Sequence, residues 1–307
     1  IALILLVQEN YLNLLQAREN VRSAQDSLTR LESQLQVTQA FHEVGLRPRL
    51  DVLQAEVDLA DAEDSLLQAQ NLVDTQIARL DTLLLVDRQS TVEYEGELGY
   101  IPFSMSLDDC LAQADNRPDL RAMRLAVEIA GKNVNIAASA FYPQVSAEFA
   151  WSSTGNTWDV RGQEYNRTEF SEWSAGITVQ WQIFDFGRTY FDVRQTQHLE
   201  RQFRADELTQ RQEVIYEITA RRLAIDEADK RIKVAQKGLE QAKEAYRMAV
   251  ARYQAQVGTN TDVLDAQAQL TRAEAQHTSA MADYLVALAR MYASLGQQNP
   301  TLLASAQ

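Results

Sequence analysis

The sequence predicts a mainly α-helical protein that carries one membrane β-hairpin, and three observations support this fold class. Apolar residues recur in heptads along most of the chain, a pattern typical of long coiled-coil helices. A segment that begins at Asp51 recurs 211 residues later, which indicates an internal repeat. All four tryptophans lie between Trp151 and Trp181, where the apolar period changes to two and predicts strands.

The internal repeat pairs two helical segments of one design. The sequences DVLQAEVDLADAE at 51–63 and DVLDAQAQLTRAE at 262–274 are identical at 7 of 13 positions. In the second copy, large residues recur every seven positions from 218 to 253 with alanines between them, and the first copy shows the same pattern from 14 to 35. This alternation is typical of a coiled-coil seam. We therefore expect long antiparallel helices in both copies.

Breaks in this pattern set the expected element boundaries. Gly45 and Gly258 mark two turns, where glycine ends one helix and a short polar residue caps the next. From 188 to 257 there is no proline and only one glycine, which allows a single helix of ~105 Å at 1.5 Å per residue. We expect six segments: a helical pair at 1–85, a linker with a short helix at 86–116, a helix at 117–141, a β-hairpin at 142–187 with its loop at 153–171, a long helix, turn and returning helix at 188–296, and a tail at 297–307.

Each expected strand of the hairpin has one apolar and one polar face. The strand at 144–152 carries Trp151 on its apolar face. The strand at 173–183 carries a longer apolar row, which consists of Trp173, Ile177, Val179 and Trp181 with smaller residues between them. Strands of this length with aromatics near their ends are typical of a membrane β-barrel, whose outer face contacts lipid. A soluble hairpin that packs tryptophan and isoleucine onto a helix gives the same pattern.

Two strands cannot close a barrel, and an open strand edge in lipid leaves backbone groups without hydrogen bonds. The second copy of the repeat carries its hairpin ahead of its long helix, so we expect the first copy to carry a matching hairpin ahead of Ile1. The chain also begins inside a helical pattern with no cap before it. Four strands per chain are still too few for a pore, which favours closure by several copies.

Charge and motif content exclude several function classes. A net charge of −14 argues against nucleic acid as a partner, because its phosphates would be repelled. Cys110 is the only cysteine, so the chain can form no internal disulfide. The three histidines are scattered, and the sequence has no metal-binding spacing, no phosphate-binding loop and no nucleophile motif. We expect neither a cofactor, nor a metal, nor an enzyme.

Several short motifs, in this order, resemble the TolC-like outer-membrane efflux proteins. They are RPDL at 117–120, where a helix begins, FYPQ at 141–144, where helix becomes strand, and WQIFDFG at 181–187, where strand becomes helix. The paired DVL segments after the two glycine turns complete the set. The resemblance covers essentially the whole chain.

This resemblance implies an outer-membrane channel that extends into the periplasm. Family members are homotrimers in which twelve strands, four per protomer, form one barrel in outer-membrane lipid. Below it the helices form a long α-barrel conduit with an equatorial belt of linker segments. Such channels export small molecules or proteins for tripartite efflux or type I secretion systems, by docking to an inner-membrane transporter and a periplasmic adaptor, or membrane fusion protein.

The resemblance also implies a gate at the periplasmic tip. The family's aperture is lined by the two aspartates of a D-V-L-D sequence, which Asp262 and Asp265 match. Asp51 is the equivalent of Asp262 in the first copy, and the position of the family's gate arginine holds Asn260, in a turn two residues shorter than usual. Asp51 and Asp262 are equally placed to cap a helix.

Two aromatic residues precede the turns and are further candidates for the constriction. Tyr253 and Phe41 could narrow the tip, but they also lie at or near heptad positions, where side chains usually pack. The competing function class is a soluble periplasmic coiled-coil adaptor or scaffold, which shares the long helices. An adaptor would carry lipoyl-like and small β-barrel domains in place of the aromatic hairpin, and the sequence shows no trace of them.

Overall fold

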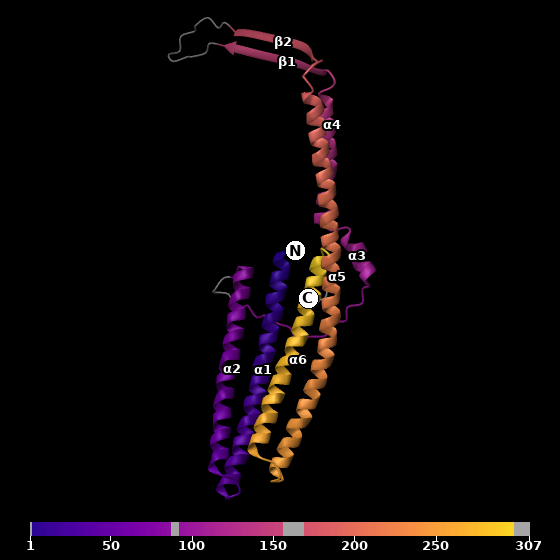
Figure 1. Ribbon diagram of the computed structural model, residues 1–307. Helices are drawn as coiled ribbons and strands as arrows, with labels where there is room; N and C mark the ends of the chain where they lie inside the picture. The colour runs from indigo at the N-terminus through magenta and orange to yellow at the C-terminus, as the bar shows by residue number, and fades with distance from the viewer. Residues whose placement is uncertain (1, 87–91, 156–168, 298–307) are drawn as a thin grey trace, which may run out of the picture. The chain divides into compact units, whose positions relative to one another are not determined.

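A computed structural model describes residues 2–86, 92–155 and 169–297 in two compact units (Figure 1). The first unit contains residues up to 117 and from 213 onward, and the second contains residues 118–212. The central part of the expected loop at 153–171 and most of the expected tail lie outside the described residues. None of the described helices is both long and apolar enough to cross a membrane.

The first unit is a row of long helices that lie side by side (Figure 1). It holds α1 (Ala2–Glu43), α2 (Arg49–Leu84), α6 (Asn260–Ser294) and the second part of α5 (Arg188–Gln254). The short helix α3 (Leu107–Ala114) follows the linker. The predicted helices are therefore confirmed, and α5 runs without a break through 67 residues because no proline interrupts it.

Part of the heptad pattern forms the core of this unit, although Val21, Leu28 and Leu35 of the first copy are only half-buried. On α1 the buried positions include Leu14 and Leu31, and on α5 they include Ile218, Ile225 and Ile232. Between α1 and α6 the core also holds a polar layer, in which Arg30 forms an ion pair with Glu274 at 2.9 Å. Each of these partly buried charges is costly without the other. The ion pair therefore favours the packing in which these two faces of α1 and α6 meet.

The second unit contains the β-hairpin, in the register that the alternation predicts. β1 (Gln144–Gly155) pairs with β2 (Glu169–Gln180) in antiparallel fashion. The apolar residues pair with each other across the strands: Val145 with Val179, Ala147 with Ile177, Phe149 with Ala175, and Trp151 with Trp173. The larger of these side chains are 63–76% exposed. Within this unit, no described helix covers the apolar face.

The strands differ from the sequence prediction at both ends. They extend into the expected loop, to Gly155 and from Glu169, and β2 ends at Gln180 rather than at Ile183. The early end has a backbone cause, because Gln180 pairs with Gln144 and the preceding Pro143 has no N–H to continue the ladder. Trp181 therefore lies beyond the strand, where its indole N–H donates to the Phe141 carbonyl at 3.2 Å.

Residues 92–106, the described part of the linker, cross the row of helices as an extended segment (Figure 1). The linker is fixed to all four helices by side-chain hydrogen bonds. Its Tyr94 and Tyr100 hydroxyls donate to Asp81 of α2 at 2.6 Å and to Asp229 of α5 at 2.8 Å. Its carbonyl groups accept from Tyr11 and Arg18 of α1 and, at 2.6 Å, from Tyr284 of α6.

Burial raises the pKa of Tyr94 and Tyr284 to about 12. Both phenols therefore remain protonated donors throughout the physiological range. Glycine is required at position 96, where φ is 144° and a Cβ would overlap the Tyr11 hydroxyl.

Candidate functional site

The five-residue turns 44–48 and 255–259, here called the paired turns, lie at the same end of the helical row (Figure 1). Their backbone hydrogen bonds repeat at the offset of 211 residues. Gly45 N–H donates to the His42 carbonyl and Gln256 N–H to the Tyr253 carbonyl, both at 2.9 Å. The two turns are thus equal in length and share one geometry.

The residue that ends each helix differs from the sequence expectation in the second turn. Gly45 takes the left-handed conformation with φ of 76°, as expected, but in the second turn Gln256 takes it with φ of 62°. Gly258 instead lies close to the end of α5, where a Cβ would be 3.2 Å from the Arg252 Cβ. Glycine at position 258 therefore allows the turn to pass close to α5, and it is not needed for a left-handed conformation.

Gln256→Gly is expected to stabilise the protein. A side chain in the left-handed region costs about 1–2 kcal/mol, and glycine recovers this at an entropy cost of about 0.5–1 kcal/mol. The net gain is about 0.5–1 kcal/mol, measured as a higher midpoint of thermal unfolding by circular dichroism. Gly45→Ala at the equivalent position is the matched control and must lower the midpoint. A lower midpoint for Gln256→Gly would contradict the repeat geometry.

Three contacts tie the paired turns and the helix ends before them to each other. The Arg47 guanidinium of the first turn donates to the Gly258 carbonyl of the second at 2.5 Å. It also lies over the Tyr253 ring, with 4.9 Å from Cζ to the ring centroid. The Phe41 ring packs against the same tyrosine at 5.6 Å. An arginine thus links the two halves of the internal repeat at the tip. It is Arg47 of the first turn, whereas the family's gate arginine corresponds to position 260.

Asn260 is the centre of a buried polar junction. Its Oδ1 accepts a hydrogen bond from the Gln34 side chain at 2.8 Å, and its Nδ2 donates to the Asp51 carbonyl at 3.1 Å. The Tyr253 hydroxyl donates to Thr38 at 3.2 Å, beside this junction. Asn260 is 1% exposed. Its two hydrogen bonds connect α6 to α1 and to α2. The tip junction is defined here as these contacts together with that of Arg47, and its residues are Gln34, Thr38, Arg47, Asp51, Tyr253 and Asn260.

The structure places Tyr253 and Phe41 inside the protomer. Tyr253 is fully buried, and Phe41 is half-buried against it. Both side chains pack between the two helical hairpins in this conformation of the chain. Their place at a constriction of an assembled channel stays a prediction.

The three candidate acids have different local partners. Asp262 completes a capping box with Thr259, whose N–H donates to Oδ2 at 2.9 Å. These hydrogen bonds from Thr259 hold the pKa of Asp262 below its usual value. Asp51 occupies the equivalent position in α2, but its cap residue is Pro48, which has no N–H to donate. The Asp51 carboxylate thus cannot form the same box.

Asp265 lies one turn further along α6 and is exposed. It lines a cavity of about 500 Å³ with Asp58 of α2. Burial, followed by the charges of Asp61 and Asp265, raises the pKa of Asp58. Asp58 is not among the residues that the sequence motifs indicate. Its spacing of seven residues from Asp51 was the signal that could have placed both acids on one face of the helix.

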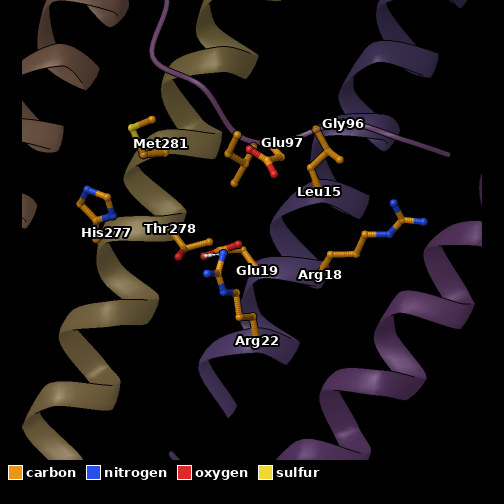
Figure 2. A pocket seen from close by; sticks show the side chains of 10 residues that line it. Leu15, Arg18, Glu19, Arg22, Gly96, Glu97, His277, Thr278 and Met281 are labelled. Atoms are coloured by element: carbon orange, nitrogen blue, oxygen red, sulfur yellow. Dashed lines mark ion pairs between the residues drawn. The ribbon is translucent and has the colours of Figure 1, made fainter. Parts of the chain in front are cut away.

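A second cavity, of about 280 Å³, lies between α1 and α6 beside the linker (Figure 2). Figure 2 shows Arg18, Arg22 and Glu19 projecting from α1, and His277 from α6. Arg22 and Glu19 form an exposed ion pair at 3.9 Å, which contributes little to stability. The linker passes this cavity at Gly96.

Long helices that end in tied turns, together with a hairpin whose apolar face is exposed, fit the class of outer-membrane proteins that carry a helical extension. The chain belongs to the outer membrane efflux protein family, whose model matches residues 1–84 and 112–297. Members of this family are outer-membrane proteins.

Known proteins of this kind resemble the chain over most of its length. Alkaline protease secretion protein AprF of Pseudomonas aeruginosa is 27% identical over 203 residues, which are 64% of this chain and 41% of AprF. The chain thus spans less than half the length of this curated relative. The outer-membrane channel OprN has the same fold, with a TM-score of 0.76 and 23% identity over 96% of this chain and 66% of that one. The outer membrane protein VceC of Vibrio cholerae has a TM-score of 0.74 and 21% identity over 96% and 69%.

Proposed function

We propose that three copies of the chain form an outer-membrane channel that exports small molecules or proteins. The observation that carries this proposal is the hairpin, whose large apolar side chains within 145–151 and 173–179 lie on one face and are exposed. Lipid is the environment that such a face fits, and a closed barrel is the arrangement that satisfies the strand edges. In the proposed trimer each protomer supplies four of twelve strands, two of which are β1 and β2.

The paired turns are the proposed docking end for a periplasmic adaptor and an inner-membrane transporter. Val44 and Leu46 of the first turn and Val257 of the second are exposed apolar residues at this tip. Apolar surface in such a place favours a protein partner. The exported substrate includes protein in this proposal because the relative AprF is named for secretion of alkaline protease.

We further propose an acidic gate at the same tip. In a trimer, three copies each of Asp51, Asp262 and Asp265 surround one axis, and carboxylates held together in a narrow mouth attract cations. The capping box of Asp262 directs its carboxylate toward its own helix. Asp51 and Asp265 therefore carry most of the expected effect on ions.

Replacement of Asp51 and Asp265 by asparagine is expected to weaken block by a trivalent cation at least tenfold. The reason is that the block depends on several carboxylates around one mouth. Conductance in planar bilayers, with and without hexaamminecobalt, measures the effect. Asp64→Asn, an exposed acid further along α2, is the matched control and must leave the block unchanged. Equal block of the double variant and the parent would place the constriction elsewhere.

A further inference from the structure

The cavity between α2 and α6 has walls of two kinds. Its apolar wall consists mainly of leucine and valine side chains that are 46–61% exposed: Leu50, Leu53 and Val57 of α2, with the half-buried Leu264 of α6 beside them. Asp58 from α2 and Asp265 from α6 supply the acidic side chains. An apolar surface with two carboxylates at one place matches a ligand that is apolar and positively charged.

The cavity also lacks its own counter-charge. Of the nine described residues that line it, none is basic. Arg47, in the neighbouring turn, donates to the Gly258 carbonyl and lies over Tyr253. Burial, and then the charges of Asp61 and Asp265, raise the pKa of Asp58, which is the direction expected for a carboxylate with no cation beside it. A bound cation would supply the missing compensation.

We propose that this cavity binds a monovalent organic cation with an apolar body, such as an aromatic quaternary ammonium. The charged group lies between Asp58 and Asp265, and the apolar body contacts Leu53 and Val57. The volume of about 500 Å³ is within the range of sites for drug-sized ligands. The site goes beyond the proposed channel, because it needs only the packed ends of α2 and α6.

The wall chemistry favours this ligand over a metal ion. Hard divalent cations take six or more oxygen ligands. In the described parts of the chain, no three histidine, cysteine, aspartate or glutamate side chains are grouped to hold a metal. A metal would also leave the leucine and valine side chains in contact with water. An organic cation uses both walls at once.

Ethidium, a fluorescent aromatic monocation, is a suitable probe. The protein is placed in nanodiscs of zwitterionic phosphatidylcholine, and fluorescence anisotropy is read against empty nanodiscs. Asp58→Asn and Asp265→Asn are each expected to weaken ethidium binding at least fivefold, and Leu53→Ser about threefold. Asp64→Asn lies on α2 outside the cavity and must bind as the parent does. Circular dichroism verifies that each variant keeps its helices.

Equal ethidium affinity in Asp58→Asn and Asp64→Asn would overturn the proposal. So would displacement of ethidium by neutral benzyl alcohol as effectively as by benzyltrimethylammonium. Absence of ethidium binding, with a basic amphipathic peptide protecting α2 and α6 from hydrogen exchange, would assign the cavity to a protein partner instead. The outcome is separate from that of the channel: a chain that binds ethidium through Asp58 but does not conduct keeps this inference and loses the proposed function.

Discussion

Val179→Arg is expected to abolish assembly of the channel, whereas Gln180→Arg is expected to leave it assembled. Val179 pairs with Val145 on the exposed apolar face of the hairpin, and Gln180 is the next residue on the opposite face. An arginine on the lipid face costs about 0–1 kcal/mol near the membrane interface and about 2–4 kcal/mol at the midplane, and a trimer carries this cost three times. An arginine on the luminal face remains in water and mainly changes ion selectivity.

The measurement is the fraction of trimer in mild detergent, determined by mass after extraction from outer membranes. The two variants introduce the same side chain at adjacent positions, so expression and charge are matched. Ile177→Arg provides a second test of the lipid face, because Ile177 belongs to the same apolar row. Equal assembly of Val179→Arg and Gln180→Arg would show that the hairpin does not lie in lipid. Extraction without detergent would favour a soluble scaffold.

Asn260→Ala is expected to open the tip. The substitution removes the partners of the Gln34 amide and the Asp51 carbonyl, and each buried group left without a partner costs about 1–3 kcal/mol. Because these bonds hold α6 to α1 and α2, the loss falls on the contact between the two helical hairpins. Resting conductance in planar bilayers is expected to rise severalfold, while the β-hairpin is untouched.

Gln269→Ala is the matched control, since Gln269 is an exposed residue of the same helix. It must conduct as the parent does. Arg47→Ala removes the hydrogen bond from Arg47 to the Gly258 carbonyl and is also expected to raise the resting conductance. A resting conductance of Asn260→Ala equal to that of the parent would show that the junction only stabilises the fold. Trimer mass separates this outcome from a failure to assemble.

The helices and the hairpin register were predictable because they depend on periodicity along the chain. Ile218, Ile225 and Ile232 are buried as the heptad requires, and the apolar rows of the hairpin pair with each other. The end of β2 at Gln180 could also have been predicted, from the position of Pro143 in the sequence. Pro143 cannot donate a ladder hydrogen bond, and the strand alternation alone does not record this.

The tip junction was not predictable, because its contacts join residues more than 200 positions apart. Asn260 meets Gln34 and the Asp51 backbone only after two hairpins have packed. By resemblance, Asn260 stands where the family has an arginine, and no sequence pattern indicates that Arg47 contacts the second turn. Asp58 escaped notice for the same reason, since its partner acid Asp265 lies on another helix.

The attachment of the linker to four helices has a mechanical consequence for the proposed gate. Tyr100 holds α5 at Asp229, about 24 residues from Tyr253, which at 1.5 Å per residue is a lever arm of about 36 Å. A tilt of about 5° about that fulcrum moves the tip by about 3 Å, the length of one hydrogen bond. We therefore expect a small rotation at the linker to break contacts of the tip junction. The linker fixes the point about which α5 tilts, and the length of α5 beyond that point determines how far the tip moves.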